Sequence, residues 1–137
     1  MSSTGSITDG RRADVELRLP ADGAYVSVLR TTTAGLAARL DFTIDDIEDL
    51  RIAVGEACAM VLPEADPGGP LLAEFFLAPG LLTVRVTVSG SEVGKPDYDG
   101  FAWQVLDTLA STATAEVDGD TFVVTLTMGT ETLELRL

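Results

Sequence analysis

The chain of 137 residues contains no histidine and a single cysteine, Cys58. The lack of histidine excludes His-based catalytic triads and metal centres ligated by His. One cysteine cannot form an intramolecular disulfide, and we expect Cys58 to act as a small buried apolar side chain. No apolar run is long enough to span a membrane. The start, Met1 to Ser6, is polar with no apolar run behind it, so we expect no secretory signal and a cytoplasmic protein.

Basic residues are also scarce. Nine Lys and Arg stand against 22 Asp and Glu, which gives a net charge of −13. Nucleic-acid phosphates repel such a surface, so we expect no direct binding of nucleic acid. The charge favours a basic protein partner and fast, salt-sensitive association, and solubility alone is the other explanation. With 46% hydrophobic and 23% charged residues, the composition is typical of a globular chain.

The length and the patterning predict one domain over residues 13–137, preceded by a small, polar, disordered tail over residues 1–12. Apolar spacings predict the order strand, two helices, two strands, helix, two strands. This order places about three helices on one face of a mixed, mostly antiparallel sheet, an α+β two-layer sandwich. The expected ranges are 15–19, 22–40, 43–62, 71–77, 81–89, 101–110, 114–117 and 121–128, and a short extra strand over 132–137 is left open.

Local signals mark several boundaries of these elements. Asp22, Thr43 and Asp99 are placed to cap the three helices. Asp118-Gly119-Asp120 predicts a hairpin, and Ala78-Pro79-Gly80 predicts a turn between two strands.

The helix expected over 43–62 is the most informative segment. From Ile52 to Leu62 its sole charged residue is Glu56, and a helix that is apolar on every face is buried on every face. A carboxylate there must be hydrogen-bonded, paired with a cation or placed at a cavity wall. A structural pairing and a functional site are equally open for Glu56. The stripe expected to face the core is Ile44, Ile47, Leu50, Val54, Cys58 and Val61.

The string Glu48-Asp-Leu-Arg-Ile-Ala-Val-Gly-Glu-Ala-Cys58 resembles the first motif helix of anti-sigma factors of the RsbW/SpoIIAB type. These are serine kinases with the GHKL (Bergerat-like) ATPase fold, in which nucleotide lies between helices and sheet. The resemblance places Glu56 at the family's catalytic glutamate, which orients the attacking hydroxyl. It places Met60 where the family has the asparagine that holds the magnesium of bound ATP. A thioether is a poor ligand for this hard cation.

The family's second motif, Asp-x-Gly-x-Gly, is also altered in this chain. The corresponding segment, Val88-Ser-Gly-Ser-Glu-Val-Gly-Lys95, keeps two glycines but lacks the aspartate that binds adenine. The degenerate positions are therefore Ser89, Gly90 and Gly94. A polar turn is the simpler explanation of the two glycines.

The third family motif is a Gly-x-Gly segment that opens the next helix and holds phosphate. Here it corresponds to Asp99-Gly-Phe-Ala-Trp103, where one glycine remains and an acid stands at the cap. For Phe101 and Trp103 we expect core packing rather than ligand stacking. This helix resembles the corresponding helix in the divergent actinobacterial branch of the family. That branch keeps sigma binding, but its nucleotide motifs are eroded.

The resemblance implies an anti-sigma factor that sequesters an alternative sigma factor, in a stress response or in development. A STAS-type anti-anti-sigma protein would release it by partner switching. The resemblance also implies a homodimer. The three altered motifs indicate an inactive Glu56 and no cofactor, with ATP and magnesium as the alternative. Arg30 matches the spacing of the family's basic partner-contacting residue, and a solvated helix arginine is the other explanation.

Two other functions stay open. The first is an active serine/threonine kinase of the anti-anti-sigma protein, which Glu56 supports. The second is a small-molecule-sensing regulatory domain with an apolar cleft, for which Met60, Phe101 and Trp103 are suited.

Overall fold

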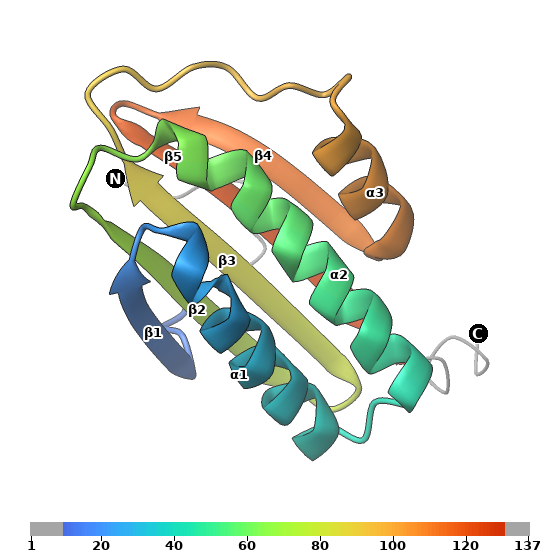
Figure 1. Ribbon diagram of the computed structural model, residues 1–137. Helices are drawn as coiled ribbons and strands as arrows, with labels where there is room; N and C mark the ends of the chain where they lie inside the picture. The colour runs from blue at the N-terminus through green and yellow to red at the C-terminus, as the bar shows by residue number, and fades with distance from the viewer. Residues whose placement is uncertain (1–9, 131–137) are drawn as a thin grey trace.

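Five strands form one sheet in the order β1-β2-β3-β5-β4, and each pair of neighbours runs antiparallel. The computed structural model describes residues 10–130, and three α-helices cover one face of this sheet (Figure 1). The expected two-layer α+β sandwich is confirmed, but the sheet is not mixed, because the described strands include no parallel pair. The elements are β1 (Val15–Pro20), α1 (Val26–Arg39), α2 (Ile44–Val61), β2 (Pro70–Ala78), β3 (Leu81–Ser89), α3 (Phe101–Leu109), β4 (Thr112–Asp118) and β5 (Thr121–Gly129).

Both tight turns expected from the sequence are present. Pro79-Gly80 joins β2 to β3, with Gly80 at φ 69°. Gly119-Asp120 joins β4 to β5, with Gly119 at φ 63°. Glycine adopts a positive φ at little steric cost, so these short segments fix the registers of both hairpins locally.

Side-chain caps begin two of the helical segments. The Thr43 hydroxyl accepts a hydrogen bond from the Asp46 N–H at 3.1 Å, which confirms the expected cap of α2. Asp22 accepts from the Ala24 N–H at 2.9 Å, but it caps a separate 3₁₀ turn, η1 (Gly23–Tyr25), that leads into α1. The helix expected from residue 22 therefore begins as a tighter turn.

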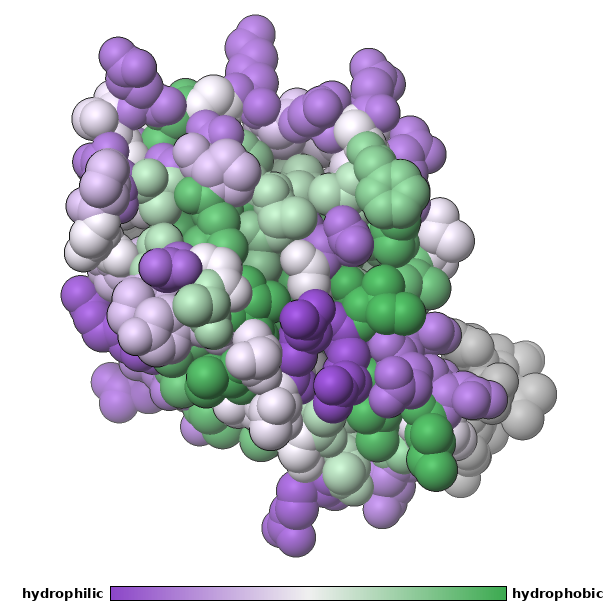
Figure 2. Space-filling view, in the orientation of Figure 1, coloured by the Kyte–Doolittle hydropathy of each residue, from purple (hydrophilic) through white to green (hydrophobic). Residues whose placement is uncertain are grey.

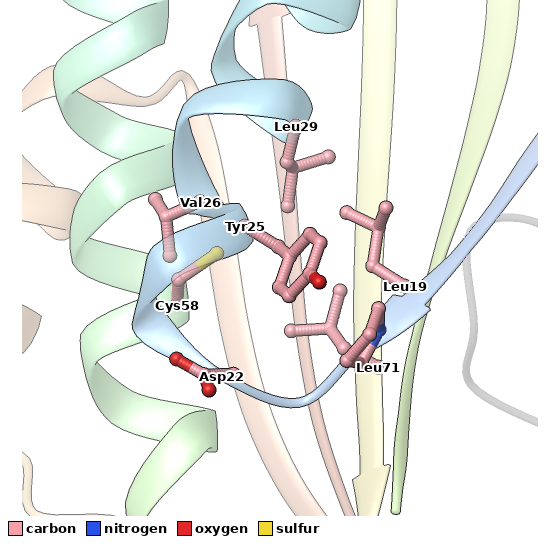
Figure 3. Close-up of a pocket in the computed structure, with 8 residues that line it drawn as sticks. Leu19, Asp22, Tyr25, Val26, Leu29, Cys58 and Leu71 are labelled. Carbon is pink, nitrogen blue, oxygen red and sulfur yellow. The ribbon is translucent and has the colours of Figure 1, made fainter.

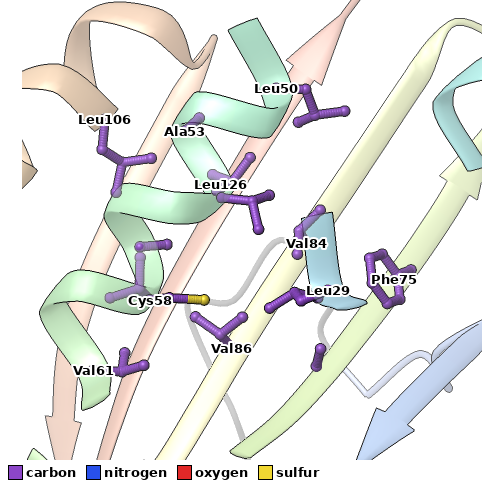
Figure 4. Close-up of a cluster of buried hydrophobic side chains, with 14 of the residues drawn as sticks. Leu29, Leu50, Ala53, Cys58, Val61, Phe75, Val84, Val86, Leu106 and Leu126 are labelled. Carbon is purple, nitrogen blue, oxygen red and sulfur yellow. The ribbon is translucent and has the colours of Figure 1, made fainter. Parts of the chain in front are cut away.

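The core lies between the helical layer and the inner face of the sheet (Figure 4). Most of the expected α2 stripe is buried, but Ile44 is 80% exposed, because at 3.6 residues per turn it is rotated away from the line through Leu50 and Val61. The expectation that α2 is buried all round is wrong. α1 and α3 flank it, while Ile52 on its outer side is 47% exposed.

The opposite face of the sheet carries no helix among the described residues (Figure 1). Arg85 on β3 pairs with Glu74 on β2 at 2.9 Å. The guanidinium carbons of Arg85 and Arg11 lie 5.3 and 5.6 Å from the centre of the Phe76 ring. Two arginines, one of them held by an ion pair, thus make cation–π contacts with Phe76 on this face.

The two ends of the chain are described only in part. Residues 1–9 of the expected tail, and the extra strand considered over 132–137, lie outside the described residues. Arg11 donates to the Leu77 carbonyl at 3.1 Å and so contacts β2. Across residues 10–130, no helix has both the length and the apolar character that a membrane span requires.

Candidate functional site

Met60 and Glu56 lie one turn apart on the side of α2 that faces α3, because residues four apart share a helix face. Both side chains are half-buried. Within residues 10–130, no ion pair or side-chain hydrogen bond involves Glu56, so the structural pairing considered for it is not present. Its carboxylate stays on the flank of the helix, beside the side chain that replaces the family's asparagine.

A cavity of about 270 Å³ lies between the end of α2 and the start of α3. Met60, Phe101 and Trp103 lie together in the wall of this cavity, as a ligand cleft would require. Core packing is the wrong expectation for Phe101, which is 77% exposed. Leu106 takes the buried position of this short helix, and Phe101, five residues earlier, points elsewhere. The other lining residues are Ala59, Pro63, Glu64, Lys95, Asp97, Gly100, Ala102 and Phe122.

Trp103 is half-buried at this cavity and is held by the loop before α3. Its ring meets the Tyr98 ring edge-on, with centroids 5.1 Å apart and planes at 82°. The Tyr98 hydroxyl donates to the Ala115 carbonyl at 2.8 Å. An edge-to-face pair fixed at its far end gives the indole a defined orientation in the cavity wall.

The start of α3 carries a carboxylate that the sequence analysis missed. The helix begins after Gly100 with no side-chain cap, so the expected cap at Asp99 is wrong. Asp97 accepts from the Asp99 N–H at 3.1 Å, and its carboxylate lies 2.7 Å from where a Cβ on Gly100 would stand. The Asp97 side chain accepts from the N–H two residues on, as in an Asx turn, so an Asp in the loop just before a helix was the available signal.

The loop between β3 and α3 is fastened to the 3₁₀ turn η2 (Leu62–Glu64) that follows α2. Glu64 accepts from the Gly94 N–H at 2.7 Å. A Cβ on Gly90 would stand 2.0 Å from the Glu64 carbonyl oxygen, so no other residue fits there without a backbone shift. Close packing therefore requires the glycine at position 90, whereas Gly94 contributes its N–H and a Cβ there would stand at an ordinary 3.5 Å from the Glu64 carboxylate.

A second carboxylate holds the beginning of the same loop. Asp66 accepts from both the Ser91 N–H (2.9 Å) and the Ser91 hydroxyl (3.0 Å). The Ser89 carbonyl accepts from the Asp66 N–H at 3.1 Å. Both serines of this segment therefore contact Asp66: Ser91 through its side chain and N–H, and Ser89 through its carbonyl.

These groups are a poor fit for a magnesium nucleotide. Met60 offers a thioether where a hard cation needs oxygen. The Asp97 carboxylate occupies the start of α3, where the positive end of the helix dipole would otherwise attract phosphate. No step of a nucleotide-dependent reaction follows from this arrangement.

Arg30 lies on the opposite flank of α2. The side chain is half-buried and rests against Gly55, so the seam between α1 and α2 holds a guanidinium rather than a freely solvated arginine. No ion pair in the described part of the chain includes Arg30. Its position suits a bidentate contact with a carboxylate that another molecule supplies.

Figure 3 shows a second pocket, between β1, the start of α1 and α2. It is too narrow for a water molecule and includes Cys58 among apolar neighbours. Burial raises the pKa of the Cys58 thiol from 9.0 to about 12, against the opposing effect of the Arg30 charge. The thiol therefore stays protonated, which agrees with the expected role as a small buried side chain.

The surface of the helical layer mixes apolar and acidic side chains. Figure 2 shows hydrophobic side chains over the helices and hydrophilic ones around the outline of this face. Exposed large apolar residues occur on η1 and on all three helices. They are Tyr25, Val28, Ile44, Ile52 and Phe101.

Sequence comparison finds relatives that share one name. The chain is 41% identical over 88 residues to the serine-protein kinase RsbW of Halalkalibacterium halodurans, a match that covers 64% of this chain and 52% of that protein. It is 37% identical over 78 residues to the serine-protein kinase RsbW of Bacillus thuringiensis, covering 56% and 49%. The matches thus span about half the length of the curated relatives. No family model matches the chain. The resemblance to the RsbW/SpoIIAB type, predicted from the helix that contains Glu56, is confirmed by these relatives.

Proposed function

We propose that this chain is an anti-sigma factor, which sequesters an alternative sigma factor and yields it to a STAS-type anti-anti-sigma protein. The observation that carries the proposal is the 41% identity over 88 residues to an RsbW protein. The fold supports it, because the motif helix is the central helix of a two-layer sandwich. We include a homodimer in the proposal, and light scattering after gel filtration measures it.

The proposed binding surface is the helical layer. Its exposed apolar side chains supply contact area, and Arg30 at the seam between α1 and α2 supplies a charged anchor. The net charge of −13 suits a sigma factor, whose DNA-facing side is basic, and would speed its association.

We further propose that the chain acts without bound ATP and magnesium. Two features support this. Met60 replaces an oxygen ligand on α2, and Asp97 places negative charge where a phosphate would lie. The chain would then change partners by competition between two proteins rather than by a phosphorylation that it catalyses.

An active serine/threonine kinase is the second candidate. The name of the relatives and the position of Glu56, one turn before Met60, favour it. Transfer of labelled phosphate from ATP to the anti-anti-sigma protein, abolished by Glu56→Gln, would establish the kinase.

Reconstituted transcription tests the main proposal. The chain is added to RNA polymerase loaded with each alternative sigma factor of the native cell, and run-off transcript is measured. We expect inhibition of one sigma factor and its reversal by one STAS protein, both without ATP. Inhibition of none of the sigma factors would reject the proposal.

A further inference from the structure

We propose that the cavity between α2 and α3 is an anchor pocket for one large apolar side chain of a basic polypeptide segment. The inference rests on the proposed function, since the segment would belong to the sequestered sigma factor. It assigns a second contact to that partner, on the flank of α2 opposite Arg30.

The size of the cavity supports a side chain as its occupant. At about 270 Å³ it has room for one large apolar side chain. Its wall of Met60, Phe101 and Trp103 offers a flexible thioether and two aromatic rings, which adapt well to an apolar anchor. The remaining wall is mixed: Ala59, Pro63, Ala102 and Phe122 are apolar, and Glu64, Lys95 and Asp97 are charged.

Exposed apolar surface continues from the cavity. Phe101 at its wall is 77% exposed. Ile52 is 47% exposed and stands seven residues, or two turns, before the cavity-lining Ala59 on α2. A polypeptide that inserts one side chain into the cavity would therefore cover further apolar surface along α2, as at the centre of a protein interface.

The charge around the cavity selects a basic occupant. The lining contains two carboxylates, Glu64 and Asp97, against the single cation of Lys95. Backbone N–H groups of Gly94 and Asp99 hold both carboxylates in place. Fixed negative charge at the mouth of an apolar pocket attracts Lys or Arg that flank an apolar anchor, and it disfavours anionic ligands.

The protein contains its own reporter, because its single tryptophan, Trp103, lines the cavity. The probe is a synthetic peptide of about eleven residues with one central Phe among Lys, Arg and Ser. Two matched peptides change the Phe to Ala, or the Lys and Arg to Gln. Titration of the full chain, followed by tryptophan emission, should give saturable binding of the parent peptide. Each matched peptide should bind at least about tenfold more weakly.

A pair of variants tests whether the Phe of the peptide binds in this cavity. Ala59→Leu adds a side chain at the cavity wall from an exposed helix position, and Ala38→Leu makes the same change at an exposed position on α1. Circular dichroism checks that both variants fold. Ala59→Leu should abolish the preference for Phe over Ala in the peptide and lower sigma affinity at least about tenfold, whereas Ala38→Leu should preserve both.

The outcomes separate this proposal from the proposed function. Equal binding of the Phe and Ala peptides would overturn the pocket, and so would tighter binding of an apolar dye than of any peptide. Inhibition of a sigma factor with full affinity in Ala59→Leu would also overturn the pocket while the proposed function stands. A Phe preference that Ala59→Leu removes, without binding of any sigma factor, would support the pocket and reject the proposed function.

Discussion

Gly55 on α2 gives the Arg30 side chain of α1 room to lie across the helix pair. The Arg30 Nη1 stands 3.0 Å from the place that a Cβ on residue 55 would occupy. The guanidinium is therefore positioned by the lack of a side chain opposite it. Since no ion pair among residues 10–130 uses its charge, we expect Arg30 to pair with a carboxylate on another molecule.

Gly55→Ala should displace the Arg30 side chain without lowering the stability of the fold. The nearest atoms to the added methyl belong to the flexible end of Arg30, which can move away. Because Ala is a better helix former, we expect the free energy of unfolding to rise by up to about 1 kcal/mol. Partner affinity should nevertheless fall as Arg30 is displaced. Urea unfolding and calorimetric titration with the partner measure the two effects, and a large loss of stability would contradict this account.

Gly90→Ala should destabilise the fold. The added Cβ would stand 2.0 Å from the backbone oxygen of Glu64, so the loop after β3 or the 3₁₀ turn after α2 must shift. We expect a loss of about 1–3 kcal/mol in urea unfolding. Gly35→Ala is the matched control, because no atom lies within 4 Å of its Cβ position. Stability of Gly90→Ala equal to that of the wild type would show that the loop accommodates the methyl group.

Arg30→Glu should weaken binding of the sigma factor or of its antagonist. The expected change is about 1–3 kcal/mol if the half-buried guanidinium pairs inside the interface. The association rate of the wild type should also fall with added salt, because exposed charges are screened beyond about 8 Å at physiological ionic strength. Stopped-flow mixing measures the rate, and a salt-independent rate with unchanged affinities would remove Arg30 from the interface.

The wild-type chain should show no saturable, magnesium-dependent binding of ATP at micromolar concentrations. Met60→Asn alone should not restore binding, because the Asp97 carboxylate remains at the start of α3. Met60→Asn combined with Asp97→Asn should bind more tightly than either single variant. Isothermal titration calorimetry tests this series. Wild-type binding that is lost on chelation of magnesium would contradict it.

Stability should decline at high pH through Cys58. The folded pKa of its thiol is raised from 9.0 to about 12, so above pH 9 the unfolded chain loses this proton while the folded chain keeps it. This contribution to stability is complete below pH 9 and is lost as the pH rises toward 12. Urea unfolding at pH 7.5, 9 and 10 should show a steeper decline for the wild type than for Cys58→Ala. Parallel declines would exclude the thiol as the cause.

Much of the fold was predictable because it depends on local chemistry. Turn glycines with positive φ fix both hairpins, and Thr43 caps α2 from its own side chain. The two errors on helix exposure share one cause. An apolar run in a sequence does not show which side of a helix its neighbours leave open, so Ile52 and Phe101 were expected inside and lie at the surface.

The sequence by itself determined the order of the elements, the two-layer class and the likeness of the α2 helix to the RsbW type. Through that likeness it also predicted that Met60 stands where the family has an oxygen ligand. Only the tertiary structure decided that Met60 and Trp103 share one cavity, that Asp97 stands at the start of α3 and that Arg30 lies in the α1–α2 seam. Caps and turns depend on residues a few positions apart. Cavities and helix seams depend on packing between segments that are distant in the sequence. No local sequence pattern specifies that packing.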